Sequence, residues 1–127
     1  MPAIQALVAA VAGDREGLRE DQFVVAEGQN GVILGCGRLR PYPAFCELAS
    51  LAVSDDARAR GVGRDIVNNL LARYQGEIYL ICEGNVVDFF LRLGLERIPE
   101  TGMPEGLRPK WDFYRSQAGA MNLMRRG

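Results

Sequence analysis

The sequence contains no histidine and only one lysine, Lys110, among its 127 residues. Without histidine the chain cannot form the Ser-His or Cys-His pairs of many hydrolases, and it lacks the commonest transition-metal ligand. The other basic residues are all arginines, which suit planar recognition of phosphate or carboxylate. A formal net charge of −1 argues against a nucleic-acid-binding surface, because such surfaces gain their affinity by neutralising phosphates.

Cysteine is also scarce. Cys36, Cys46 and Cys82 are odd in number, lie in apolar stretches and show no C-x-x-C spacing, so we expect buried, reduced thiols. No apolar run approaches the length of a membrane span, and the first residues lack the cationic start of a signal peptide. We therefore expect a cytoplasmic protein that needs neither metal nor disulfide, with one domain over residues 1–127.

The hydrophobic pattern predicts alternating strands and helices. In chain order, the predicted elements are helical segments at 4–13 and 14–20, strands at 23–27 and 32–39 that form a hairpin, a strand at 46–53, a helix from residue 61, a strand at 77–82, a helix at 86–93, a strand at 95–98 and a last edge strand at 111–116. Pro41 and Pro43 are expected to end the hairpin. The tail from Ala118 is expected to be a short helical turn or frayed. One face of the strand at 46–53 is expected to carry Glu47, Ala49, Leu51 and Val53.

The stretch from Cys46 to Leu71 organises the rest of the chain. Its strand is followed by an arginine-bearing loop and by a helix that opens at Gly61, in the pattern R-x-x-G-x-G from Arg58 to Gly63. The first amides of a helix have no intrahelical acceptor, and the helix dipole adds partial positive charge, so this turn is suited to an anion. Glycine lets a phosphate approach the backbone. The same glycines are equally compatible with a tight turn that binds nothing.

The order of strand, glycine turn, helix, strand and helix resembles the acetyl-CoA-dependent N-acetyltransferases of the GNAT superfamily. The second strand of this unit reads IYLIC, and the following helix, VVDFFLRLG, ends in F-x-x-x-G before Leu95. Two longer runs look like the acetyltransferase domain of N-acetylglutamate synthase: RPYPAFCELASLAVSDDARARGVGRDIV and MPEGLRPKWDFYRSQAGAMNLM. The resemblance covers residues 14–124.

This resemblance implies an α/β (α+β) fold of the GNAT type, with a mixed central sheet of about six strands, a splayed parallel pair and helices on both faces. Two departures accompany it. The superfamily usually opens with a strand, whereas this sequence starts in a helical pattern, so the first strand is expected to be missing. Many relatives have a tyrosine near the sulfur of CoA where this sequence has Phe90.

The resemblance also implies acetyl-CoA as cosubstrate and no metal. The residues that it assigns to acetyl-CoA are Leu51, Ala52, Val53, Arg58, Arg60, Gly61, Val62, Gly63, Arg64, Asn85 and Phe90. The pyrophosphate is assigned to the backbone amides of 60–64, with side-chain contacts from Arg58 and Arg60. The amides of 51–53 are candidates to hold the acetyl carbonyl. Asn85 stands where relatives contact the pantetheine, or it is the N-cap of the next helix.

The acceptor side of the expected reaction rests on three residues. Glu47 is the candidate general base, directly or through a water, because attack on a thioester needs an unprotonated amine. An exposed or arginine-paired acid is the alternative for Glu47. Arg115 and Ser116 match the carboxylate-binding Arg and Ser of the family, and a salt bridge at the rim is the alternative for Arg115. Cys82 and Tyr114 are weaker candidates for a proton donor.

Together these residues predict an acetyl-CoA-dependent N-acetyltransferase that acts on a small amine, by resemblance an amino acid such as glutamate. Transfer to a polyamine, an antibiotic or a protein N-terminus is an open alternative, and so is a non-catalytic acyl-CoA-binding module. Neither nucleic acid nor a membrane is an expected partner. A missing first strand would leave a sheet edge that a second subunit could cover, so a homodimer is expected to be accessible.

Overall fold

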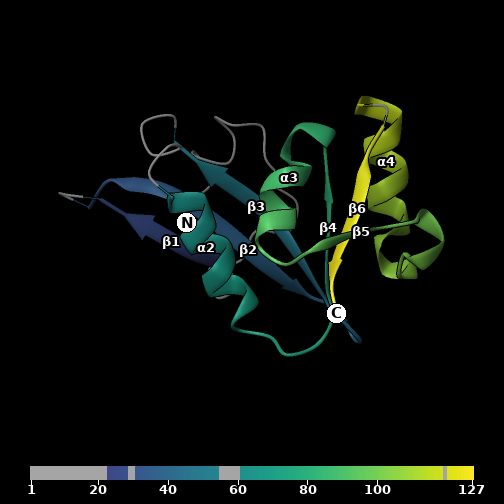
Figure 1. Cartoon of the computed structure of the whole chain (residues 1–127), viewed down its shortest axis with the longest axis horizontal. Helices are drawn as coiled ribbons and strands as arrows, with labels where there is room; N and C mark the ends of the chain where they lie inside the picture. The colour runs from purple at the N-terminus through teal and green to yellow at the C-terminus, as the bar shows by residue number, and fades with distance from the viewer. Residues whose placement is uncertain (1–22, 29–30, 55–60, 119) are drawn as a thin grey trace.

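The structure, a computed structural model, describes residues 23–28, 31–54, 61–118 and 120–127. Its strands are β1 (Phe23–Glu27), β2 (Ile33–Pro41), β3 (Cys46–Val53), β4 (Ile78–Cys82), β5 (Glu96–Ile98) and β6 (Asn122–Arg126). Its helices within these ranges are α2 (Val62–Leu71), α3 (Val87–Arg92) and α4 (Arg108–Ala118). The strands form a 6-stranded sheet in the order β1-β2-β3-β4-β6-β5 (Figure 1). The predicted mixed α/β class is confirmed.

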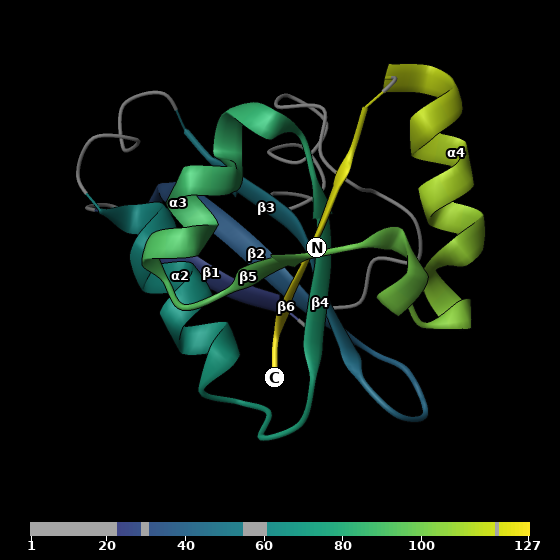
Figure 2. The ribbon, with the colours of Figure 1, turned by 45° about the vertical axis from the view of Figure 1, so that its right-hand side comes forward.

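Helices cover both faces of this sheet (Figure 2). Helices α2 and α3 pack on one face, over a core that includes Ile66, Leu70 and Phe90. Helix α4 lies on the opposite face, where Leu107 and Trp111 belong to a second core cluster. Apolar burial on both faces holds the central strands in place, and burying each large apolar side chain contributes roughly 1.5–3 kcal/mol.

Strands β1 and β2 form the predicted antiparallel hairpin. Strand β2 extends two residues beyond its predicted end, because Pro41 still pairs with Cys46 at the end of the ladder. A proline is tolerated there, since the last ladder position need not donate an amide. The turn into β3 closes with the Tyr42 N–H donating to the Phe45 carbonyl at 2.8 Å, and the two rings stack with centroids 4.4 Å apart.

A β-bulge interrupts β3 and changes which residues share a face. Cys36 of β2 pairs with Ala52, but Arg38 pairs with Ala49, so β3 has two residues where β2 has one. Ser50, one of those two, has φ 55°, a conformation that non-glycine residues rarely adopt.

The expectation that Glu47, Ala49, Leu51 and Val53 share one face is therefore wrong. Leu51 and Val53 pack against the core under α2, whereas the Glu47 side chain contacts Lys110 of α4 on the opposite face. The extra residue reverses the alternation of side chains after Ala49.

Strands β3 and β4 are the parallel pair that the resemblance implied. They pair at Cys46 with Ile78 and at Glu47 with Tyr79, and beyond these pairs they separate. Figure 1 shows the two ribbons meeting near the C-terminal label and diverging from there. Strand β4 continues its ladder on the other side, with antiparallel β6.

The predicted helices that flank β4 are confirmed. Helix α2 begins after Gly61, which has φ 77°, and it buries Ile66, Val67, Leu70 and Leu71 as the spacing predicted. Helix α3 follows a 3-10 turn at Gly84–Val86 and ends before Gly94, whose φ of 95° suits glycine at a helix C-terminus.

Two predictions for the C-terminal part are wrong. The segment 111–116 is not an edge strand but the middle of α4, and the tail is not helical or frayed but forms β6 between β4 and β5. The aromatic residues of 111–116 favoured a strand. Leu107, Trp111 and Tyr114 nevertheless follow helical spacing, and the first two are fully covered between α4 and the sheet.

The end of β6 is fixed by Arg126. Its guanidinium donates to the carbonyls of Leu71, Tyr74 and Gly76 at 2.7, 2.5 and 2.9 Å, so it closes the loop that leaves α2. The helical segments predicted at 4–13 and 14–20, and with them the question of a missing first strand, lie outside the described residues.

Candidate active site

A cleft of about 730 Å³ opens where β3 and β4 separate. This volume lies within the range of about 300–1,000 Å³ that is usual for small-molecule sites. Its walls come from β3, the start of α2, β4 with the turn after it, α3 and α4. Of the predicted site residues, those that line the cleft are Glu47, Leu51, Ala52, Val53, Gly61, Gly63, Arg64, Asn85 and Phe90.

One end of the cleft is the start of α2. Gly61 accepts the first intrahelical hydrogen bond, from the Asp65 amide at 3.1 Å, and no side chain among the described residues caps this helix start. The amides of Val62 and Gly63 precede that first bond and belong to the group that an α-helix leaves without an internal acceptor. A helix start with such amides is suited to an anion.

Of the three arginines predicted at this helix start, the structure describes Arg64. A Cβ built on Gly61 would lie 2.8 Å from the Arg64 guanidinium, so that exposed side chain lies directly over the turn. Arg64 also contacts Asp65, with 3.4 Å between Nε and Oδ1. Arg58 and Arg60 lie outside the described residues. Val62 packs its half-buried side chain against the core and does not line the cleft.

At the junction of β3 and β4, Glu47 is held by two residues from different parts of the chain. Lys110 of α4 donates to Oε2 at 2.6 Å, and the Tyr42 hydroxyl donates to Oε1 at 3.1 Å. The side chain of Glu47 is 2% exposed and that of Lys110 is 12% exposed. Burial, followed by the negative charge of Glu47, raises the pKa of Tyr42, which remains a donor at neutral pH. The predicted base is therefore buried and paired, but with lysine rather than arginine.

The middle of the cleft is apolar, with polar groups at its mouth. Phe89 and Phe90 meet edge to face at 5.0 Å between ring centroids, and Phe90 is buried in the core as well as lining the cleft. Asn85 lies exposed in the 3-10 turn before α3, and within the described residues no side chain caps that turn or the helix. The N-cap alternative for Asn85 thus finds no support, whereas its position on the cleft wall fits a ligand contact.

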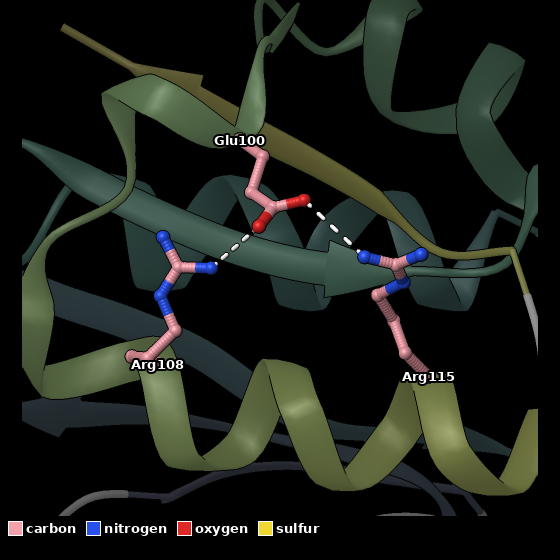
Figure 3. Close-up of polar contacts among 3 residues, drawn as sticks. All are labelled: Glu100, Arg108 and Arg115. Carbon is pink, nitrogen blue, oxygen red and sulfur yellow. Dashed lines mark hydrogen bonds and ion pairs between the residues drawn. The ribbon is translucent and has the colours of Figure 1, made fainter.

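Arg115 and Ser116 are not part of the cleft lining. Figure 3 shows Glu100 between two arginines of α4, with Arg108 at 2.5 Å and Arg115 at 3.4 Å from its carboxylate oxygens. All three side chains are exposed, by 43% or more. The Ser116 hydroxyl donates to the carbonyl of Phe113 in its own helix, at 2.7 Å. The rim salt bridge that was left open for Arg115 is what the structure shows.

The three cysteines are free and buried, as predicted. Burial raises the pKa of Cys36 and of Cys82 to about 11 and also raises that of Cys46. Cys82 lines the cleft as a neutral thiol, next to the Met124 sulfur at 3.8 Å. Tyr114, the other weak candidate for a proton donor, also lines the cleft.

The sequence reasoning missed Lys110 and Tyr42. Lys110 stood out as the only lysine, but 63 positions separate it from Glu47, so no local pattern joins them. Tyr42 lies in the turn between the two prolines that were read only as strand breakers. Neither residue shows a short motif that could have revealed its role.

No three or more Cys, Asp or Glu side chains among the described residues lie together as a metal site would require. Over the same residues, no helix combines the length and apolar character that crossing a membrane would need.

A family model described as an acetyltransferase (GNAT) domain matches residues 19–97. No curated protein matches the sequence significantly. N-acetylglutamate synthase from Neisseria gonorrhoeae, complexed with coenzyme A and N-acetyl-glutamate, is similar with a TM-score of 0.80 and 23% identity, over 99% of this chain and 32% of that one.

Two shorter proteins are similar over most of both chains. A Mycobacterium tuberculosis protein in complex with CoA has a TM-score of 0.74 and 21% identity, covering 98% of this chain and 91% of that one. Escherichia coli ElaA has a TM-score of 0.74 and 16% identity, covering 99% and 88%. At such identities the likeness establishes a shared fold, and this chain spans only 32% of the length of the Neisseria enzyme.

Proposed function

Because the chain belongs to the GNAT acetyltransferase family, we propose that it transfers the acetyl group of acetyl-CoA to the amino group of a small amine, an amino acid such as glutamate. The observation that carries the proposal is the cleft itself. At one end it has a helix start that no described side chain caps, and at the other a buried carboxylate, with an apolar wall between two separating strands joining them.

The helix start of α2 would hold the pyrophosphate of acetyl-CoA. The amides of Gly61, Val62 and Gly63, with the helix dipole behind them, suit an anion, and Arg64 adds a cation above the turn. Arg58 and Arg60 are proposed to contact the phosphates from the preceding loop. Similar proteins from Neisseria gonorrhoeae and Mycobacterium tuberculosis were solved in complex with CoA, which supports CoA as the ligand.

The wall between β3 and β4 would hold the pantetheine and the thioester. Strand β3 leaves β4 after Glu47, so the backbone from Leu51 to Val53 faces the cleft rather than a neighbouring parallel strand. We assign to its amides the stabilisation of the oxygen that becomes negative during attack. Asn85 is proposed to contact the pantetheine from the turn before α3.

Glu47 is proposed as the general base, directly or through a water. The amine of an amino acid is mostly protonated at neutral pH, with an ordinary pKa of about 8 or above, so it must lose a proton before it attacks. A carboxylate fixed by Tyr42 at the closed end of the cleft can take that proton. Phe90 offers no hydroxyl to the leaving sulfur, but a thiol of pKa about 8.5 leaves readily as thiolate.

The test is a screen for acceptors with acetyl-CoA, using free amino acids, polyamines and short peptides, with CoA release and acetylated product both measured. We expect acetyl transfer to at least one amino acid. Transfer to a polyamine or peptide alone would correct the acceptor class. Tight CoA binding without product on any amine would instead favour the non-catalytic module, and absence of CoA binding would overturn the assignment.

A glycine variant makes the CoA site itself testable. A Cβ on Gly63 would meet Val53 at 3.4 Å and Phe89 at 3.5 Å, ordinary contacts, so Gly63→Ala is expected to fold normally. It would place a methyl group in the cleft and weaken CoA binding by about tenfold, the cost of roughly one hydrogen bond. Asn68→Ala, on the exposed side of the same helix, is the matched control.

A further inference from the structure

The ion pair between Lys110 and Glu47 is unusual in its position. It stands on the wall of the cleft, with Nζ and Oε2 only 2.6 Å apart, and both side chains are largely withdrawn from water. A buried ion pair is weak evidence for a stabilising role, because desolvating two charges offsets most of their attraction. An ammonium and a carboxylate kept together in a ligand-sized cleft are better explained by what they bind.

A free amino acid has the complementary arrangement of charges. Its ammonium and its α-carboxylate are attached to the same carbon, so the two charges are as close together as those of Lys110 and Glu47. If it lies against the pair, its carboxylate meets the Lys110 ammonium and its ammonium meets the Glu47 carboxylate. Each charge then has an opposite partner, which a buried charge requires.

We propose that Lys110 is the residue that binds the α-carboxylate of the acceptor, so that the acceptor is recognised as a zwitterionic amino acid. This inference rests on the proposed acetyl transfer. An ammonium has three N–H donors and can serve Glu47 and a second carboxylate together. The cation–π contact of Nζ with the Tyr114 ring, at 5.9 Å from the centroid, helps to keep Lys110 at the cleft wall.

The other cations that the sequence or their position suggests are less suitable for binding the carboxylate of the acceptor. Arg115 is exposed and bound to Glu100 outside the cleft lining. Arg64 does line the cleft, but it lies over the start of α2, where the phosphates are proposed to bind. Of the described cationic side chains that line the cleft, Lys110 is the one in contact with the proposed base.

This arrangement also places the acceptor nitrogen for reaction. Its ammonium, held by Glu47, gives one proton to that carboxylate and becomes a neutral amine. The nitrogen then forms a bond with the acetyl carbon while the bond from that carbon to sulfur breaks. The sulfur leaves as thiolate and takes up the proton held by Glu47, directly or through water. The nitrogen loses its second proton to water as the amide forms.

The first experiment compares acid and amide acceptors with the unmodified protein. The probes are L-glutamate and its α-amide, isoglutamine, with any other amino acid found active and its α-amide as a second pair. We expect kcat/KM to be about 10- to 100-fold lower for the amide, which lacks one charged hydrogen bond. The α-carboxylate raises the pKa of its own amine, so amine reactivity alone would favour the amide.

The second experiment changes Lys110. Lys110→Gln should raise KM for the amino acid by about 10- to 100-fold more than it raises KM for the amide, so that the preference for the acid is lost. Lys110→Arg should restore part of that preference, because it keeps the charge. Arg108→Gln, which removes an exposed cation from the same helix, is the control and should keep the preference.

The outcomes separate this inference from the proposed function. Equal rates with acid and amide, or a preference that persists in Lys110→Gln, would overturn the role of Lys110 and leave acetyl transfer intact. Acetylation of polyamines alone would likewise overturn the role of Lys110 and leave acetyl transfer intact. Absence of product with every amine would overturn both proposals. Turnover of the amide by Lys110→Gln shows that the variant is folded, and the acid–amide comparison needs no variant.

Discussion

Helix α4 takes part in two groups of opposite charges, one on each side. On its inner side Lys110 meets Glu47, at 12% and 2% exposure, and on its outer side Arg108 and Arg115 meet Glu100, each at 43% exposure or more. Both groups pair a carboxylate with basic side chains, but they differ in their exposure to water. Water screens the charges of the outer group, so the loss of one partner has little effect on stability. In the inner group, the loss of one partner leaves the other charge buried and uncompensated, which destabilises the fold.

This contrast separates Arg115, the cation that residue type favours for the acceptor, from Lys110, the cation that we propose. An arginine in an aromatic segment fits a carboxylate on chemical grounds, and Arg115 does bind one, that of Glu100. The side of α4 on which a basic residue lies decides which carboxylate it contacts. The inner side faces the cleft and carries Lys110, so it is burial rather than the type of cation that favours Lys110 in our proposal.

The largest expected effect is that of Glu47→Gln on turnover. The amide keeps the shape of the side chain but cannot take a proton, so acetyl transfer should fall by about 100- to 10,000-fold while CoA affinity stays the same. Steady-state rates and calorimetric titration with CoA would measure the two. Turnover at the wild-type level would remove Glu47 from the mechanism.

The next effect in size is on stability. Lys110→Met leaves the Glu47 carboxylate buried without its cation and should lower the free energy of unfolding by about 3 kcal/mol. Glu100→Gln should cause no resolvable change, because its partners are solvated. Urea unfolding of both variants measures the difference. Adding Glu47→Gln to Lys110→Met should recover most of the lost free energy of unfolding. Equal losses from Lys110→Met and Glu100→Gln would mean that the inner and outer groups do not differ in their effect on stability.

A smaller effect is expected for Arg115→Gln. Since Arg115 lies outside the cleft lining, KM for the amino acid acceptor should change by less than about twofold. The same kinetic assay that is used for Lys110→Gln measures it. A tenfold rise in KM would mean that Arg115 reaches the acceptor after all, and it would restore the expectation drawn from the sequence.

The smallest effect is the pH dependence of the outer group. The hydrogen bond from Arg108, together with the charges of Arg108 and Arg115, lowers the pKa of Glu100. A lowered folded-state pKa stabilises the protein above the unfolded value of about 4.3, and that contribution is lost as pH falls through the folded value. Any stability difference between wild type and Glu100→Gln at pH 7 should therefore shrink as the pH falls below about 4.3. A stability difference that grew on acidification would contradict a lowered pKa of Glu100.

The boundaries of α2 and α3 could be predicted because their signals are local. Gly61 and Gly94 occupy positive φ at the start of α2 and after the end of α3, where a glycine is a strong boundary signal. The bulge at Ser50 could not be predicted, because it depends on how β2 pairs with β3 rather than on either sequence alone. One extra residue was enough to move Leu51 to the other face.

The C-terminal part shows a conflict between two signals. Aromatic content favoured a strand at 111–116, while the spacing of Leu107, Trp111 and Tyr114 indicated a helix, and burial against the sheet decided for the helix. Glu47 could be proposed from a motif on its own strand. Its partner Lys110 could not, since only the packing of α4 against the sheet brings the two together.

The place of β6 bears on how the chain folds as it is made. Strands β4 and β5 both leave the ribosome before the strand that lies between them, so their inner edges stay open until Asn122–Arg126 has been synthesised. Until Asn122–Arg126 is in place, the chain presents two unpaired strand edges to other chains, an opportunity for aggregation.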